Sequence, residues 1–255
     1  MMIKNLKRAL VNSPLRSPYI GLAGIYHSAR RLFIYPSTAH VGKVDYDAYW
    51  DEKFAATRGR MSTWRLRRAR AFASLVEPGD HVLDLGVGDG ALLKYLIDER
   101  HIIGSGLDIS QQAVAFCREQ GLDVDLADVN QPIGNFIQGT YDYVIMSEII
   151  EHLPEPETLL DSLRPYARKG LIISIPNTGF YQHRLRLLFG KFPLQWIVTP
   201  GEHLRFWTLT DFRWWARQMR FKVVREIPYE GTPSLRNVMP SLFASAFVYV
   251  LETTS

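Results

Sequence analysis

The 255-residue sequence has few of the features that mark secreted or membrane-spanning chains. Cys117 is the single cysteine, so no disulfide can form within the chain, and a reducing compartment such as the cytoplasm is the expected location. No apolar run reaches the roughly 18–20 residues that a membrane-spanning helix needs. The most apolar stretch, residues 242–251, is about half that length and predicts a buried strand.

Acidic residues are missing from the first 44 positions, which hold seven Lys and Arg residues. We therefore treat residues 1–44 as a basic N-terminal arm and residues 45–255 as one domain. Apolar residues recur in the arm at helical spacing, which predicts an amphipathic helix around residues 20–35. The arm has no long apolar core, so a secretory signal is not expected, whereas its acid-poor composition also suits an organelle transit peptide.

Strands and helices alternate from residue 81 onward. Strands are expected at 81–85, 102–108, 122–126, 141–147, 169–175, 221–230 and 242–251, and helices near 89–100, 110–120, 155–168 and 210–219. This alternation predicts a mostly parallel sheet with helices on both faces. Residues 45–76 are expected to be helical. The segment 177–207 interrupts the rhythm and is too long for an ordinary connection, which is typical of a functional insertion.

The stretch "HVLDLGVGDGALLKYL", residues 81–96, runs from an apolar strand through a glycine turn into a helix. Compared with the dinucleotide fingerprint G-x-G-x-x-G, its third glycine, Gly90, comes one residue early. Asp84 and Asp89 flank the turn and would repel a pyrophosphate. A cofactor that carries cations fits better, and S-adenosylmethionine carries an ammonium and a sulfonium but no phosphate. An NAD(P)-dependent enzyme is the competing interpretation.

Later strands end in side chains that would complete such a site. Asp108 ends the second strand, 22 residues after Gly86, where a carboxylate can accept both ribose hydroxyls. Ile109 would lie against the adenine, Asp128 would accept from its amino group, and Ser147 would lie beneath the methyl-transfer site. The predicted cofactor-binding residues are Asp84, Gly86, Gly88, Gly90, Asp108, Ile109, Asp128 and Ser147. Cofactor binding without catalysis is also compatible with this set.

Over residues 46–252 these elements resemble the class I S-adenosylmethionine-dependent methyltransferases. The resemblance implies an α/β fold: a doubly wound, mostly parallel, Rossmann-like sheet of seven strands, one of them antiparallel. In this chain the N-terminal helical arm would precede that domain, and the insertion 177–207 would follow the fifth strand. The resemblance also implies S-adenosylmethionine as the cofactor and methyl transfer as the reaction.

The segment "SEIIEHLPEP", which starts at Ser147, predicts the reaction centre. If it forms a helical turn, Glu148, Glu151 and His152 share a face at i, i+3 and i+4. Two carboxylates and an imidazole can hold a divalent cation, Mg²⁺ or Zn²⁺, with His203 as a fourth ligand. The set resembles the ExxEH of UbiG-like ubiquinone O-methyltransferases and of Hen-type small-RNA 2′-O-methyltransferases.

Two other interpretations of this segment stay open. His152 can be an unaided general base, with Glu148 as the second catalytic residue. Alternatively, the segment simply starts the next helix and forms a wall of the cofactor pocket.

The C-terminal half carries a second resemblance. "SIPNTGFYQHRLRLLFGKFP", followed by "HLRFWTLTDF", is similar to the methionine-biosynthesis family MetW. It implies an alternative function, a cofactor-binding protein that activates or anchors a biosynthetic partner enzyme. The chain departs from the MetW pattern at 147–152, where MetW-type chains lack the ExxEH. That departure favours a true transferase, one that O-methylates a small or lipophilic acceptor.

The insertion is expected to form a basic amphipathic segment. Apolar residues on one helical face are Tyr181, Leu185, Leu188, Phe189 and Phe192, bordered by Arg184, Arg186 and Lys191. Together with the arm, residues 178–200 favour peripheral contact with the inner membrane surface and a lipid-like acceptor. No RNA-binding module is recognisable, so nucleic acid is not an expected partner. The competing interpretation is that both segments bury their apolar faces on the fold.

Overall fold

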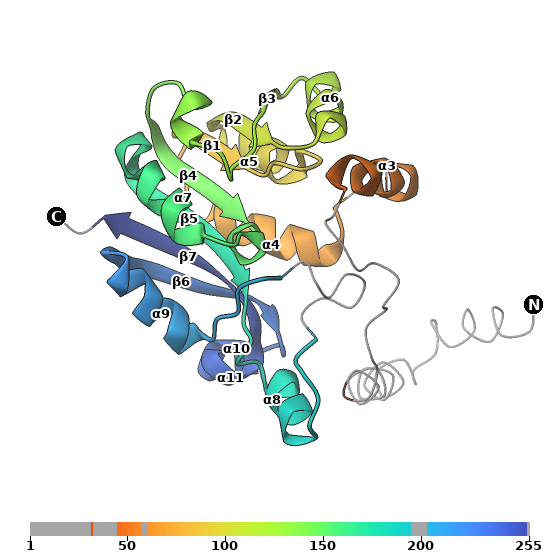
Figure 1. Cartoon of the computed structure of the whole chain (residues 1–255), viewed down its shortest axis with the longest axis vertical. Helices are drawn as coiled ribbons and strands as arrows, with labels where there is room; N and C mark the ends of the chain where they lie inside the picture. Colours follow the sequence, from red (N-terminus) through yellow and green to blue (C-terminus); the bar gives the residue numbers. More distant parts are fainter. Residues whose placement is uncertain (1–31, 33–44, 58–60, 195–202, 254–255) are drawn as a thin grey trace, which may run out of the picture.

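In the computed structural model, one twisted sheet forms the centre of the chain, with helices on both of its faces (Figure 1). The structure describes residue 32 and residues 45–57, 61–194 and 203–253. The amphipathic helix predicted around residues 20–35 therefore lies outside the described residues, Leu32 excepted. No helix in the described part of the chain is long and apolar enough to span a membrane.

The sheet has the strand order β3-β2-β1-β4-β5-β7-β6. Strand β7 runs antiparallel to both of its neighbours, and the other pairs are parallel. The seven-stranded, doubly wound sheet with one antiparallel strand is thereby confirmed. The strands are β1 (His81–Leu85), β2 (Ile103–Asp108), β3 (Asp123–Leu126), β4 (Tyr141–Ser147), β5 (Ala167–Pro176), β6 (Phe221–Gly231) and β7 (Ala244–Thr253).

The helices follow the predicted alternation with one clear difference. The helix expected over 155–168 ends earlier, because Arg164–Tyr166 form a 3-10 turn around Pro165, whose ring disfavours further α-helix. The helices are α3 (Tyr46–Thr57), α4 (Thr63–Ala73), α5 (Ala91–Arg100), α6 (Gln111–Glu119), α7 (Pro156–Leu163), α8 (Tyr181–Leu188), α9 (Leu209–Gln218), α10 (Leu235–Val238) and α11 (Pro240–Phe243).

Two hydrophobic layers bury the two faces of the sheet. Alternate residues of a strand point to opposite faces, so Leu83 and Leu85 join the layer under α7 and α9, while Val82 joins the layer under α4, α5 and α6. The central strands are apolar on both faces, as a parallel sheet covered by helices requires. This packing fixes the carboxyl ends of β1, β2 and β4 side by side, where the functional site lies.

Helix α9 shows how local sequence sets an element. Thr208 and Asp211 form a capping box at its start, as the sequence predicts, because each side chain satisfies a backbone N–H that the helix leaves unpaired. Phe212 and Trp215, which are three residues apart and so lie on one face of the helix, are buried against the sheet. The aromatic segment is therefore part of the hydrophobic core.

Candidate active site

A cavity of about 1600 Å³ opens at the carboxyl ends of β1, β2 and β4. Helices α3, α4 and α8 contribute to its wall. Typical pockets for one drug-sized ligand have roughly 300–1,000 Å³, so this cavity has room for a cofactor and a second molecule. The predicted cofactor-binding residues that line it are Asp84, Gly86, Gly88, Asp108, Ile109, Asp128 and Ser147.

Neighbouring side chains pack closely against the backbone of the glycine turn. Gly86 and Gly88 have φ angles of +69° and +58°, in the left-handed region that favours glycine. A Cβ atom on Gly86 would collide with the Ile149 side chain, and one on Gly88 would lie 2.5 Å from Cζ2 of Trp50. Glycine at both positions therefore keeps the backbone open toward the cavity.

Gly90 has a different position from the one expected of a cofactor-binding residue. It is absent from the cavity wall and instead precedes α5, with a φ of +69°. A Cβ atom there would lie 2.5 Å from Leu122 Cδ1 and 2.8 Å from Cys117 Sγ. Gly90 thus allows α5 and α6 to pack closely, which is a structural role.

Asp84 is a buried carboxyl group at the centre of the site. Its side chain is 1 % exposed, and its Oδ1 atom has no hydrogen-bond partner. Burial is the main cause that raises the pKa of Asp84 to about 8. The Arg68 guanidinium lowers this pKa, whereas the negative charges of Asp108 and Asp89 raise it further. A buried, unpartnered carboxyl group is costly unless a cation or donor meets it, so Asp84 fits the ammonium of a bound cofactor.

Asp89, in contrast, already has a cationic partner. Both of its carboxylate oxygens accept from the Arg65 guanidinium on α4, in a bidentate ion pair. Asp89 lines the cavity as Asp84 does, but the Arg65 guanidinium balances its charge. The sequence predicts a helix over this region but gives no sign that Arg65 reaches the turn.

Asp108 lies beside the turn as predicted. Its two oxygens accept from the backbone N–H groups of Gly88 (2.7 Å) and Ser110 (2.9 Å), and burial raises its pKa. Each carboxylate oxygen has a second lone pair, so Asp108 can still accept from hydroxyl groups. Next to it, Ile109 is 43 % exposed toward the cavity, and Asp128 Oδ1 accepts from Asn130.

The carboxylate of Glu148 does not group with the ligand atoms of Glu151 and His152. It has a left-handed φ of +60°, and the turn that follows it, Ile150–His152, is 3-10 rather than α-helical. The predicted face shared with Glu151 and His152 is therefore not formed. Glu148 Oε1 instead accepts from Ser174 Oγ and Tyr229 OH, both at 3.0 Å, while the residue lines the cavity.

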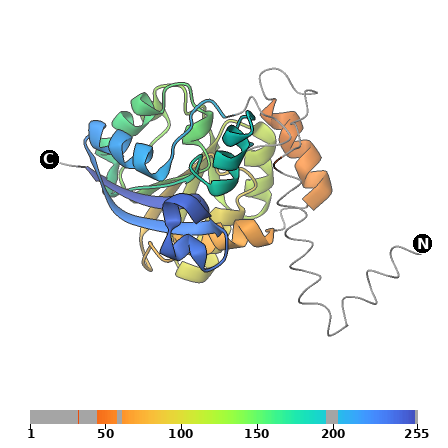
Figure 2. The ribbon, with the colours of Figure 1, turned by 90° about the horizontal axis from the view of Figure 1, so that it is seen from below.

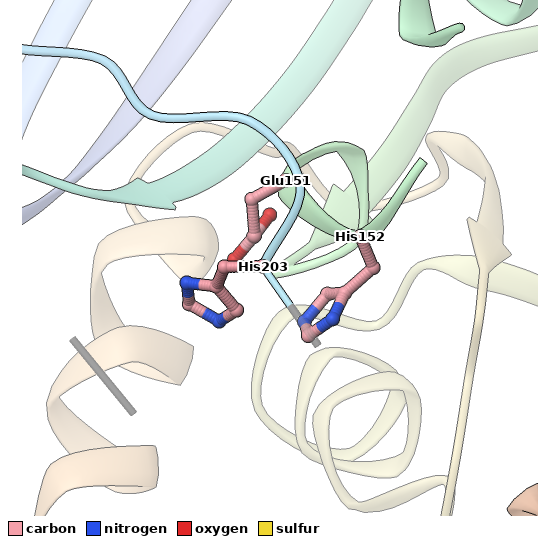
Figure 3. A group of neighbouring side chains, drawn as sticks. All are labelled: Glu151, His152 and His203. Carbon is pink, nitrogen blue, oxygen red and sulfur yellow. The ribbon is translucent and has the colours of Figure 1, made fainter. Parts of the chain in front are cut away.

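Glu151, His152 and His203 converge (Figure 3), and the two histidines line the cavity. One ligand atom from each residue lies within 4.8 Å of those of the other two, and the imidazole centroids are 4.7 Å apart. The chain brings His203 here because the N–H groups of Leu204 and Arg205 donate to the Glu151 carbonyl, at 2.8 and 3.1 Å. Three of the four residues predicted as metal ligands are thus together.

The electrostatics of this cluster favour neutral groups. Glu151 is fully buried, both of its carboxyl oxygens lack a partner, and burial together with nearby Glu148 raises its pKa well above the ordinary value. Burial, with His152 as a second cause, lowers the pKa of His203 to about 3. A buried carboxyl group beside two imidazoles is a donor set that suits a divalent cation.

Sequence reasoning missed Arg68, which also lines the cavity. Its guanidinium lies 4.3 Å from the centroid of the Trp64 ring, and its charge acts on both Asp84 and Glu151. The basic run in "WRLRRAR" is visible in the sequence. It does not reveal that three of its four arginines, Arg65, Arg67 and Arg68, line the cavity, because that depends on how α4 packs on the sheet.

The family model described as "Methionine biosynthesis protein MetW" matches residues 67–251. The chain belongs to this family. A relative named bifunctional methionine biosynthesis protein MetXA/MetW, from Rhodopirellula baltica, is 26% identical over 71% of this chain. This chain spans 34% of that bifunctional protein's length.

The chain is also similar to proteins that carry other names. The protein named ubiquinone biosynthesis O-methyltransferase from Methylococcus capsulatus is 24% identical, over 70% of this chain and 80% of its own length. A crystal structure of a SAM-dependent methyltransferase from Archaeoglobus fulgidus has a TM-score of 0.56 and 19% identity, and the alignment covers 79% of this chain and 99% of that one. The chain thus belongs to the MetW family and has the fold of the class I methyltransferases.

Proposed function

We propose that this chain is an S-adenosylmethionine-dependent methyltransferase that methylates an oxygen atom of a small or lipophilic acceptor. The observation that carries the proposal is Asp84, a buried carboxyl group without a partner in the wall of a cavity large enough for two ligands. Similarity to ubiquinone biosynthesis O-methyltransferases supports oxygen as the acceptor atom. The cofactor supplies a methyl group already activated on its sulfonium.

Each part of the cofactor has a counterpart in the cavity wall. Asp84 would receive the methionine ammonium, and Arg68, whose charge acts on Asp84, would receive the adjacent carboxylate. Asp108 would accept the ribose hydroxyls, while Ile109 and Asp128 would contact the adenine. The residues thus bind the cofactor and hold it in place, which is the main contribution a protein makes to an in-line displacement.

An oxygen acceptor must also lose its proton. We propose that Glu151, His152 and His203 bind a divalent cation, Mg²⁺ or Zn²⁺, that polarises the acceptor hydroxyl. Glu148 would not be one of these ligands, since its carboxylate accepts a hydrogen bond from Ser174. If no ion binds, His152 is left as the general base, because it lines the cavity.

A radiolabelled methyl group tests the reaction. The full chain is incubated with S-adenosylmethionine carrying a labelled methyl and with a panel of probes that includes a catechol, a phenol and a total lipid extract. We expect label to enter an oxygen-bearing probe, and the Asp84→Asn variant to lose most of this transfer. Label found only on nitrogen or carbon would overturn the proposed acceptor atom.

The relative named bifunctional methionine biosynthesis protein MetXA/MetW supports a second function, because its name combines two proteins in one chain. In that alternative the chain binds the cofactor and activates or anchors a biosynthetic partner enzyme. Co-purification of a stoichiometric biosynthetic enzyme, with no methyl transfer to any probe, would favour this function over ours.

Peripheral membrane contact belongs to the same proposal. We infer it from residues 178–200 and from the basic arm, of which only Leu32 lies among the described residues. Arg186, expected at the border of an exposed face, is instead 3 % exposed, and donates to the carbonyls of Phe192 (2.8 Å) and Leu32 (3.1 Å). The hydrogen bond to Leu32 supports packing of this one residue beside α8.

Arg68 gives a direct prediction for cofactor binding. The Arg68→Ala variant is expected to bind S-adenosylhomocysteine roughly 10- to 100-fold more weakly, the scale of a hydrogen bond between charged groups. Arg70→Ala is the matched control, since Arg70 is exposed near the end of the same helix. Isothermal calorimetry at one pH and salt concentration measures both. Equal affinity for the two variants would contradict the role of Arg68.

A further inference from the structure

Two segments border the cavity on the side away from the glycine turn. Residues 178–194 include α8, and residues 231–246 include α10 and α11; we call them the rim. Both contribute to the cavity wall, through Tyr181 and Pro233 among others. The Tyr181 and Phe243 rings lie 5.7 Å apart, which joins the two segments. In Figure 1 the three helices lie at the lower end of the molecule, and Figure 2, seen from below, shows α8 to one side of α10 and α11.

Exposed apolar side chains gather on the rim and on the adjoining 204–206 segment. Of the fifteen large hydrophobic side chains exposed among the described residues, seven belong to the rim and two to that segment. Phe192 and Phe206, whose rings are 5.5 Å apart, connect that segment to the rim. The nine are Leu187, Leu188, Phe189, Phe192, Leu204, Phe206, Leu235, Val238 and Met239. A concentration of this kind beside a cavity marks an interaction surface.

The charge of the rim is of one sign. Its 33 residues contain no Asp or Glu, although the chain has 26 acidic residues in 255. It contains four Lys and Arg residues, of which Arg186 is buried. Of the other three, Arg184 is exposed, while Lys191 and Arg236 are half-buried, and Arg236 donates to the Tyr229 carbonyl. Apolar side chains with cations alone among them complement a layer of anionic headgroups over acyl chains.

We propose that the rim docks on an anionic lipid surface and that the cavity takes its acceptor from that surface. Leu188 and Val238, each 76 % exposed and on opposite segments of the rim, would enter the layer on both sides of the cavity. The acceptor would then be an amphiphile whose hydroxyl-bearing head reaches the site while its apolar part stays in the lipid. This inference rests on the proposed function, of which it names the docking surface and the class of acceptor.

Vesicle flotation of the full chain tests the docking. The probes are vesicles of phosphatidylcholine alone and of phosphatidylcholine with phosphatidylglycerol. We expect the chain to float with the anionic vesicles, at least 10-fold less with the neutral ones, and less at high salt, because ions screen the headgroup attraction. A double variant, Leu188→Glu with Val238→Glu, is expected to lose at least 10-fold of the binding.

Trp214→Glu is the matched control, since Trp214 is 58 % exposed on α9, outside the rim. It should float like the unaltered chain. Flotation of the rim variant equal to that of this control would overturn the proposal, and so would a lack of binding by the unaltered chain. A change from dimer to monomer in the rim variant would assign the surface to a second copy instead. Unchanged binding of S-adenosylhomocysteine by all variants separates these results from a failure of the cofactor site.

Discussion

The Asp84→Asn variant is expected to bind S-adenosylhomocysteine roughly 10- to 100-fold more weakly than the unaltered chain, as measured by calorimetry. An amide removes the negative charge that would meet the methionine ammonium. Asp80→Asn is a matched control, because Asp80 is equally buried but pairs with Lys169 (2.6 Å) on the far side from the cavity. The control should keep its affinity for the cofactor product.

The same group predicts a pH dependence of binding. Burial raises the pKa of Asp84 to about 8 in the ligand-free chain, so its carboxyl group is mostly protonated at neutral pH and must lose that proton to pair with an ammonium. Affinity for S-adenosylhomocysteine should therefore rise with pH up to about 8, by at most about tenfold per unit. The affinity of Asp84→Asn should lack this rise.

Stability should change in the opposite direction. A carboxyl group whose folded-state pKa is raised contributes stability below its unfolded pKa and loses it as pH rises toward the folded value. The unaltered, ligand-free chain should thus lose stability between about pH 4 and 8 through Asp84. Melting temperatures of both chains at pH 5 and pH 8 measure the difference. If Asp84→Asn gains nothing relative to the unaltered chain at pH 8, the account of this carboxyl group is wrong.

Loss of a metal ligand is the second prediction with a large effect. His203→Ala is expected to weaken Zn²⁺ binding by at least about 10- to 100-fold. Loss of a residue that only hydrogen-bonds to a metal ligand already lowers the affinity for the metal by that factor. Glu148→Gln should change ion binding far less than His203→Ala, because Glu148 lies outside the cluster of Glu151, His152 and His203 and acts on it only through its charge near Glu151. His81→Ala, at an exposed histidine, is the surface control.

Titration with Co²⁺, whose visible absorption reports its ligands, measures these affinities directly. A loss of affinity in Glu148→Gln equal to that in His203→Ala would restore the four-ligand arrangement expected from the ExxEH spacing. Absence of any ion binding by the unaltered chain would contradict the metal site. It would leave His152 as the general base.

Most of the fold follows from patterns that lie within short stretches of sequence. The strand ending at Asp84, the glycine turn and the strand ending at Asp108 are each set by local hydrophobicity and by glycine. Parallel strands place their carboxyl ends on one edge, so these residues had to meet. The capping box of α9 is equally local, with both partners within four residues.

The remainder of the site depends on packing between distant elements. Arg65 and Arg68 reach the glycine turn only because α4 packs against the sheet, and no spacing in the sequence encodes that approach. The turn after Ser147 is 3-10 because Glu148 takes a left-handed conformation held by Ser174 and Tyr229, from β5 and β6. A helical spacing rule applied to 147–152 therefore groups the wrong side chains.

Calorimetry of the full chain with S-adenosylhomocysteine and with NAD measures which cofactor the glycine turn holds. We expect S-adenosylhomocysteine to bind at one site per chain and NAD to show no measurable binding, since a pyrophosphate would meet the buried carboxyl group of Asp84. Tighter binding of NAD, or no binding of S-adenosylhomocysteine, would contradict it.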